Sequence, residues 1–294
     1  MGSRILAIGE VLWDLLPSGR QLGGAPANFA YHCHALGAEA RLVSRVGDDP
    51  LGREILKRFR QVQLPIDTVA IDTAAPTGTV PVELGPGGQP RFTITENVAW
   101  DRIKADAAAL ELAASADAIY FGSLAQRSEP ARQAIRKLVA ASPQSALKVF
   151  DANLRPPFVD REVIEHSLTL ANLLKLNDQE LTVFAEIFGI EGSVLDQVAE
   201  LAGRFKLTTV VLTRGERGSL LWTRRGWYDH PGAAVDVSDT VWAGDAFTSA
   251  LTVGLLAGWG LEAINQRANE VAAYVCTKPG GMPELPERLR ILPR

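Results

Sequence analysis

Several features that would point to particular classes of protein are scarce or missing in this sequence. It has only two cysteines, Cys33 and Cys276, which argues against a disulfide framework and fits a reducing compartment. No apolar run approaches the roughly 18 residues of a membrane span, and acidic residues interrupt segment 1–17 too early for a secretory signal. A formal net charge of −4 gives no electrostatic reason to bind nucleic acid or an anionic membrane. We therefore expect a cytoplasmic protein that binds neither.

Two common nucleotide-binding motifs and a metal-binding pattern are also missing. The segment "AIGEVLWD" (7–14) has a single glycine where a dinucleotide-binding protein would have G-x-G-x-x-G, and G-x-x-x-x-G-K-[ST] occurs nowhere. His32 and His34 are two residues apart, so they would face different ways on a helix, while His166 and His230 are isolated. These absences argue against a dinucleotide-dependent oxidoreductase, a Walker-type phosphate loop and a zinc site.

What the sequence does contain is a regular alternation of short apolar runs and longer helical patterns. The stretch 128–142 is such a helix, with Ser128 as its N-cap and Pro130 in the first turn. Alternation of this kind predicts an α/β fold with a mainly parallel sheet that helices cover on both faces. The runs expected to be buried strands are 4–9, 40–47, 117–123, 147–153, 173–177 and 208–213.

Residues 65–98 interrupt this alternation. The runs 79–84 and 91–98 place apolar residues at every second position, and "GPGG" (85–88) separates them. This pattern predicts a hairpin with one solvated face, in which Pro81 is easiest to accommodate on an edge strand. A small antiparallel flap of this kind can close over a substrate and exclude water.

The first candidate site is "AGDAFTSALTVGLLAG" (243–258). Ala243 and Gly244 are expected to form a turn before a helix over 246–257, and a helix N-terminus attracts anions such as phosphate. A carboxylate at Asp245 would oppose simple phosphate binding, but it suits a general base that takes a proton from an attacking hydroxyl. The alternative is that Asp245 only caps the helix.

The second candidate site is "GGAPANFAYHCHALG" (23–37). Its two glycines allow the backbone to approach a ligand closely, and Asn28 can both donate and accept hydrogen bonds to hydroxyl groups. A helix should follow, with Phe29, Cys33 and Leu36 on one face and Gly37 at its end. The alternative is a tight turn and a helix with no ligand.

Together, "GGAPANFA" (23–30) and "DTVWAGDAF" (239–247) resemble the two signatures of the ribokinase-like (PfkB-type) sugar kinase family. Within that family, "GEVLWD", "ENVAWD", "FGSLAQR" and "DANLR" are most similar to bacterial fructokinases. The resemblance covers nearly the whole chain, because further family-like segments follow in the expected order. These segments are "VGDDPLG" (46–52), "PTGTV" (76–80), "DANLR" (151–155), "KLNDQEL" (175–181), "VVLTRGERGS" (210–219) and "ANEVAAYVCTKPGGMP" (268–283).

The resemblance implies a ribokinase-like fold and ATP-dependent phosphorylation of a sugar's primary hydroxyl, most simply D-fructose to fructose 6-phosphate. It implies a core of residues 1–11, 31–64 and 99–294, and a β lid of residues 12–30 and 65–98 that permits a homodimer. Asp245 would be the base and would also contact the sugar. The other implied sugar ligands are Asp14, Gly24, Asn28 and Arg127.

The same resemblance implies the sites for ATP and metal ions. The anion hole for the transferred phosphoryl group would consist of Trp242, Ala243 and Gly244. The nucleotide site would include Thr213, Gly215, Gly218 and Asn269. Mg²⁺ would be held through water by Asn177 and Glu180, and a monovalent cation such as K⁺ by Asp239 and Val241.

Trp242 departs from the family pattern, which usually has glycine or alanine at this position. The indole ring either turns away while its backbone N–H still serves the anion hole, or it occupies the phosphate site and impairs transfer. We favour an active fructokinase-like enzyme. The alternatives are a kinase for another sugar or sugar acid, such as ribose or 2-keto-3-deoxygluconate, and a non-catalytic sugar-binding protein.

Overall fold

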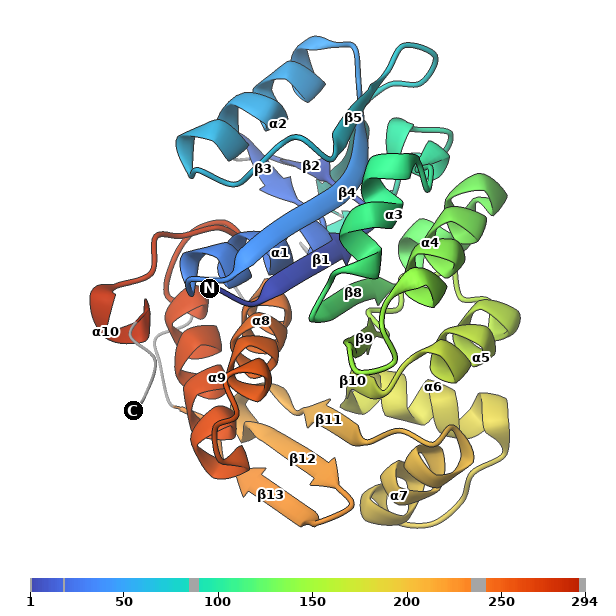
Figure 1. Cartoon of the computed structure of the whole chain (residues 1–294), viewed down its shortest axis with the longest axis vertical. Helices are drawn as coiled ribbons and strands as arrows, with labels where there is room; N and C mark the ends of the chain where they lie inside the picture. Colours follow the sequence, from blue (N-terminus) through green and yellow to red (C-terminus); the bar gives the residue numbers. More distant parts are fainter. Residues whose placement is uncertain (1, 18, 85–89, 234–241, 291–294) are drawn as a thin grey trace.

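The structure is a computed structural model that describes residues 2–17, 19–84, 90–233 and 242–290. Within these ranges the strands form a large sheet and a small sheet, and helices lie on both faces of the large one (Figure 1). The expected mainly parallel sheet between two helical layers is therefore confirmed.

The large sheet is parallel from β11 to β5, and β12 and β13 continue it in antiparallel pairing. All six runs predicted as buried strands are neighbours within its parallel part. In spatial order, the strands are β13 (Gly226–His230), β12 (Ser219–Thr223), β11 (Thr209–Thr213), β10 (Leu173–Asn177), β9 (Leu147–Asp151), β8 (Ala118–Gly122), β1 (Arg4–Ile8), β4 (Glu39–Gly47) and β5 (Val69–Asp72).

Each face of the large sheet has its own apolar core, because successive side chains of a strand point to opposite faces. On β1, Leu6 and Ile8 join one core, whereas Ile5 and Ala7 join the other. The two helical layers lie on opposite sides in Figure 1. The first core contains α3 (Ala107–Ala114), α4 (Glu129–Ala141), α5 (Arg161–Leu170), α6 (Asp178–Phe188) and α7 (Val194–Arg204); the second contains α1 (Ala25–Ala35), α2 (Pro50–Gln61), α8 (Ala243–Leu256), α9 (Leu261–Cys276) and α10 (Glu287–Arg290).

The small sheet contains the predicted hairpin, but two details of the prediction were wrong. The second strand covers only residues 90–92, although the amides of Thr93 and Thr95 continue the same register by bonding to Pro81 O and Thr79 O. Pro81 is on an internal strand, where its carbonyl accepts a bond although it has no N–H to donate. Residues 85–88 lie outside the described ranges. In spatial order, the strands are β3 (Gly19–Gly23), β2 (Leu12–Leu16), β6 (Gly78–Leu84) and β7 (Pro90–Phe92).

Two predicted helix starts also differ in detail. Ser128 occupies the N-cap position of α4, but its hydroxyl makes no capping bond and instead donates to Asp101 O at 2.7 Å. Helix α8 begins at Ala243, three residues earlier than predicted, because Trp242 takes the N-cap position. Ala243 and Gly244 are therefore the first helical residues and do not form a separate turn.

Segments that are distant in the sequence join the small sheet to helix α2. The Asp49 side chain caps α2 through Gly52 N and also accepts bonds from the amide and hydroxyl of Thr77, each at 2.8 Å. From the small sheet, Trp13 Nε1 donates to Leu51 O at 3.1 Å. Strand β5, which lies within the range expected for the lid, pairs with β4 in the large sheet. The division into core and lid remains a prediction.

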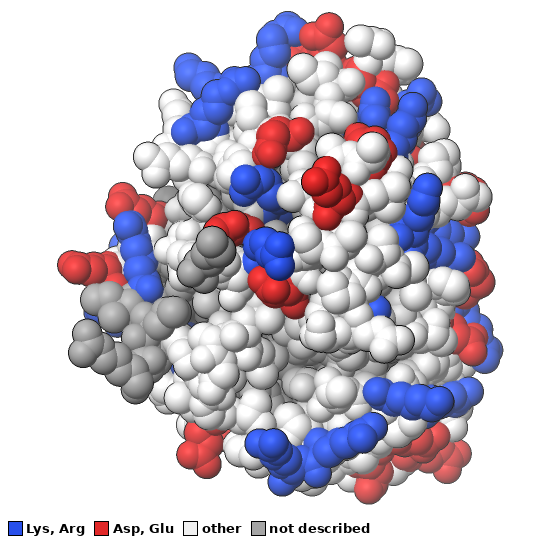
Figure 2. Space-filling model, in the orientation of Figure 1, with Lys and Arg blue, Asp and Glu red and all other residues white. Residues whose placement is uncertain are grey.

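The surface of the described molecule has mixed charge. Lys and Arg side chains are interspersed with Asp and Glu over the face in Figure 2. Among the described residues, no helix is both long enough and apolar enough to cross a membrane.

Candidate functional site

The candidate site residues gather at the carboxyl edge of the parallel strands. Strand β1 lies between β4 and β8, so the chain runs outward from it in both directions. In open α/β sheets, ligands bind in the crevice at such a switch point. Glu10 follows β1 by two residues, while Asp151, Asn177 and Thr213 end β9, β10 and β11.

Asp245 lies in the first turn of α8, and only 7% of its surface is exposed. Asn28 Nδ2, on the neighbouring helix α1, donates to Asp245 Oδ2 at 2.8 Å. Since Trp242 holds the N-cap position, Asp245 is not the cap of this helix. The amides at the start of a helix have no partner within it, so Ala243 and Gly244 present N–H groups beside the carboxylate.

The surroundings of Asp245 disfavour its charged form. Burial and the like charge of Asp151 raise its pKa to about 7, although Asn28, Lys175 and Arg155 act in the opposite direction. A group with this pKa can accept a proton near neutral pH and then remain protonated. The carboxylate is therefore chemically suited to act as a base.

Among the described residues, buried polar atoms without partners are found on α1, beside Asp245, and in the segment that follows β1. Asn28 Oδ1 and Glu10 Oε2 are buried and have no hydrogen-bond partner within the described ranges. Burial also raises the pKa of Glu10. Gly24 has a φ of +104°, and a Cβ there would lie 2.5 Å from Glu10 O. Asp14 lies on β2 opposite Gln21. Buried polar atoms usually have partners, so Asn28 Oδ1 and Glu10 Oε2 suit a ligand rich in hydroxyl groups. Glu10 was not among the site residues predicted from the sequence.

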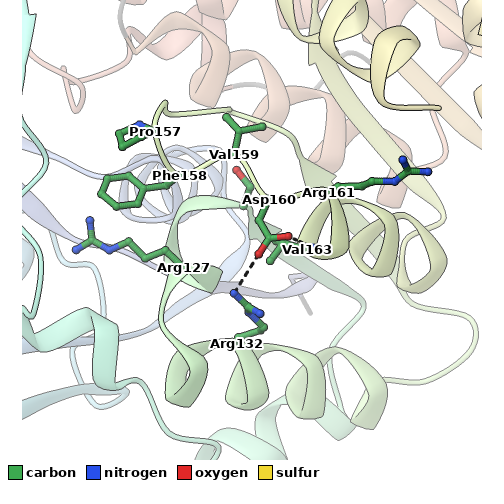
Figure 3. A pocket seen from close by; sticks show the side chains of 9 residues that line it. Arg127, Arg132, Pro157, Phe158, Val159, Asp160, Arg161 and Val163 are labelled. Carbon is green, nitrogen blue, oxygen red and sulfur yellow. Dashed lines mark hydrogen bonds and ion pairs between the residues drawn. The ribbon is translucent and has the colours of Figure 1, made fainter. Parts of the chain in front are cut away.

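Arg127 is largely committed to contacts within the protein. Its Nε and Nη2 bond to the Asp101 carboxylate at 2.8 and 2.9 Å, and Nη2 also donates to Thr95 O at 2.6 Å. The guanidinium lies 4.0 Å from the centre of the Trp100 ring. It lines a hollow of about 450 Å³ next to Phe158 (Figure 3). Only Nη1, which is buried and unpartnered among the described residues, remains for a ligand.

The Trp242 side chain is packed into the second core, with 5% of its surface exposed. It lies against Gly281, where an added Cβ would be 2.9 Å from ring atom Cδ1. His32, which is fully buried, packs against the same segment, with its Nε2 2.9 Å from Gly281 O. The same added Cβ would lie 2.6 Å from Asn28 Oδ1, which places the indole near Asn28.

Asn177 and Glu180 form the start of α6. Asn177 Oδ1 accepts from Glu180 N at 2.9 Å, and Glu180 Oε2 accepts from Asn177 N at 2.8 Å. Glu180 Oε1 accepts from Leu154 N, so both carboxylate oxygens already have backbone partners. Among the described residues, no group of three or more His, Cys, Asp or Glu side chains could hold a metal. The pair fits indirect contact with Mg²⁺ through water better than direct coordination.

The predicted nucleotide-site residues surround the start of β12. Thr213 ends β11, and Gly215 and Gly218 have positive φ angles of 59° and 74° in the following turn. Asn269, on α9, donates to Ser219 Oγ at 2.7 Å. The proposed ligands of the monovalent cation, Asp239 and Val241, lie outside the described ranges.

The structure reveals a buried ion pair to which the sequence analysis gave no role. Lys175 Nζ lies 3.1 Å from Asp151 Oδ1, and the two residues are register partners on β10 and β9. A signal was available, because both charged residues stand in apolar runs predicted to be buried strands. A buried charge requires a partner, and neighbouring parallel strands provide one.

Comparisons with known proteins agree with this geometry. The profile described as "pfkB family carbohydrate kinase" matches residues 19–288. A fructokinase from Klebsiella pneumoniae is 32% identical over 97% of this chain and 97% of its own length. The crystal structure of an uncharacterized sugar kinase from Pyrococcus horikoshii in complex with ATP has a TM-score of 0.81 and 29% identity, covering 95% of this chain and 94% of that one. A Vibrio cholerae fructokinase double mutant, bound to fructose, ADP and potassium ion, has a TM-score of 0.82 and 25% identity, covering 97% and 95%.

Proposed function

Because the chain belongs to the pfkB family of carbohydrate kinases, we propose that it transfers a phosphoryl group from ATP to the primary hydroxyl of D-fructose, forming fructose 6-phosphate and ADP. The observation that carries the mechanism is the buried Asp245 carboxylate beside the unpaired amides of the first turn of α8. The choice of fructose rests on the likeness to fructokinases.

In this mechanism, Asn28 holds the carboxylate of Asp245 in place, and Asp245 takes the proton of the sugar hydroxyl. The hydroxyl oxygen then bonds to the γ-phosphorus as the bond between that phosphorus and the bridging oxygen of ADP breaks. The amides of Ala243 and Gly244 donate to the transferred group, where negative charge must be stabilised. Asp14, Gly24, Asn28 and Arg127 are the proposed sugar contacts.

The nucleotide is proposed to bind along Thr213, Gly215, Gly218 and Asn269. Mg²⁺ would neutralise charge on the phosphates, with Asn177 and Glu180 reached through water. Asp239 and Val241 remain the proposed ligands for K⁺. The Trp242 ring is buried, which supports the alternative in which the ring turns away from the anion hole and the backbone N–H of Trp242 remains available.

The proposal is tested by measuring ADP release with ATP, Mg²⁺ and K⁺ against fructose, ribose, glucose, 2-keto-3-deoxygluconate and adenosine. We expect turnover with fructose and a loss of about 10²- to 10⁴-fold in kcat for Asp245→Ala, because the base is removed. Calorimetry should show that this variant still binds fructose. Turnover with another acceptor would correct the substrate but keep the mechanism, and near-normal turnover by Asp245→Ala would reject Asp245 as the base.

A further inference from the structure

The buried Asp151–Lys175 pair lies directly beneath the first turn of α8. Asp151 has no exposed surface in its side chain, and that of Lys175 is 7% exposed. A Cβ added to Gly244 would lie 3.1 Å from Lys175 Nζ, so the ammonium group occupies the space that a larger residue would need. The positive charge is therefore adjacent to the helix turn that carries Asp245.

The second oxygen of Asp151 connects the pair to two further elements. Tyr120 OH, on β8, donates to Asp151 Oδ2 at 3.2 Å. Thr248 Oγ1, on α8, lies 3.3 Å from the same oxygen and 2.8 Å from Gly244 O. Tyr120 and Thr248 are both fully buried. Through Thr248, which also bonds to Gly244 in the first turn, Asp151 thus connects the start of α8 to three adjacent strands of the large sheet.

Stability alone does not explain this arrangement. Removing two charges from water carries a large desolvation penalty, and a pair of apolar residues of similar volume is often as stable or more stable. A buried charge pair does, however, exert a strong field on neighbouring groups, because the surroundings screen it weakly. Among the nearby groups on which such a field can act are Asp245 and Glu180, and Asp245 is the one placed at the proposed reaction centre.

Several elements present charged or titratable groups around Asp245. Asp151 opposes its ionisation, whereas Lys175, Arg155 and the amide of Asn28 favour it. Lys175 stays charged because the facing carboxylates outweigh the effect of its burial, and its pKa is raised. Three more groups complete the surroundings: Tyr120 on β8, Glu10 after β1 and Glu180 on α6.

We propose that Asp151 and Lys175 are positioning residues for phosphoryl transfer: they hold the first turn of α8 in place and set the charge balance that allows Asp245 to act as a base near neutral pH. This inference rests on the proposed role of Asp245. Neither residue needs to touch the substrate, since both act through Asp245 and the helix that carries it.

The test compares the acid limb of the pH profile of kcat/KM, which reports the base of the free enzyme. In Asp151→Asn, loss of the negative charge should move this limb to lower pH. In Lys175→Met, loss of the positive charge should move it to higher pH. Each shift should be about one pH unit or more, as is usual for a neighbouring charge. The double variant should fall between the two single variants.

Lys148→Met is the matched control, because it removes a positive charge from β9 three residues before Asp151. Its acid limb should coincide with that of the unmodified protein.

Tyr120→Phe is a milder probe, because each of the two single variants leaves a buried charge unpaired. Loss of the hydrogen bond from Tyr120 to Asp151 should strengthen the repulsion between Asp151 and Asp245. The acid limb of the pH profile should then move to higher pH. Parallel shifts in the two single variants, or no shift in them and in Tyr120→Phe, would overturn the inference.

A second measurement needs no catalysis. The raised pKa of Asp245 means that the folded protein loses stability relative to Asp245→Asn as pH rises from about 4 to about 7. Denaturation at pH 5 to 8 should show this loss, and the loss should be smaller in the Asp151→Asn background. An equal loss in both backgrounds would overturn the inference. If Asp245→Ala keeps its turnover, Asp245 is not the base and the proposed mechanism fails, whereas absence of the charge-dependent shifts alone rejects only the inference.

Discussion

The proton affinity of Asp245 depends on residues far from it in the sequence. Asn28, which holds its carboxylate, is 217 positions away, and Asp151, which opposes its ionisation, ends strand β9 in another part of the chain. An aspartate in the first turn of an isolated helix would be solvated and stabilised in its charged form by the helix dipole. Here burial outweighs that effect, so the same residue can serve as a base near neutral pH.

Trp242 provides a test at the same scale. Its ring is buried against Gly281, so Trp242→Ala should leave a cavity and lower the free energy of unfolding by about 3–5 kcal/mol. Trp227→Ala is the control, because Trp227 is 36% exposed and should lose much less. Denaturant unfolding of both variants measures the difference. Equal, small losses would show that the indole of Trp242 is not packed in the core.

At the scale of elements, the start of helix α8 is the feature on which the site depends. The helix begins at Ala243, so the amides of Ala243 and Gly244 belong to its first turn and point out of its end. Ten consecutive residues, from Asp245 to Gly254, are buried, since α1 and α9 pack against the helix as well as the sheet. This packing keeps the turn in one position without a capping side chain.

The turn between β11 and β12 gives a prediction for the proposed nucleotide site. A Cβ at Gly218 would clash with the backbone of His230, and Gly218 has a φ of +74°. Gly258 has a φ of +73° but open space around it, so it is a matched control. Gly258→Ala should lower the free energy of unfolding by about 1 kcal/mol, and Gly218→Ala by more. Calorimetry should also show weaker ATP binding by Gly218→Ala only. Equal effects in both variants would contradict the prediction.

At the scale of the molecule, one set of contacts joins the small sheet to helix α2, which packs in the second core of the large sheet. Trp13 bonds to Leu51, and Arg20 forms an ion pair with Glu54. The proposed sugar ligands come from both parts, Asp14 from the small sheet and Asn28 from the layer on the large one. A bound sugar would therefore link the two sheets.

Hydrogen exchange tests this link. With saturating fructose, amides of β2, β3 and β6 should exchange more slowly, because ligand binding makes local opening less favourable. The amides of α7, remote from the site and in the other core, should not change and are the internal control. Slower exchange in α7 but not in the small sheet would contradict a sugar site between the sheets.

The homodimer through the lid remains a prediction. Among the residues whose exposure the structure describes, the exposed large hydrophobic side chains are Ile71, Val194, Leu195 and Trp227. Light scattering decides between the 31.7 kDa of one chain and twice that mass.

The sequence by itself determined the class of fold and the position of the proposed base along the chain. Strands β1, β8 and β11 were recognisable because residues buried on both faces of a parallel sheet form short, nearly continuous apolar runs. The segment 243–247 was recognisable because small residues followed by an acid at a helix start form a local pattern. Such patterns depend on neighbouring residues only, so no tertiary contact is needed to read them.

Only the tertiary structure decided the environment of that base. The pairing of Asp151 with Lys175, the burial of Glu10 and the position of the Trp242 ring against Gly281 all arise from contacts between distant segments. The same contacts made Pro81 internal, since the pairing of β2 with β6 joins residues more than 60 positions apart. Burial and charge–charge distance set a pKa, and both are properties of the folded chain.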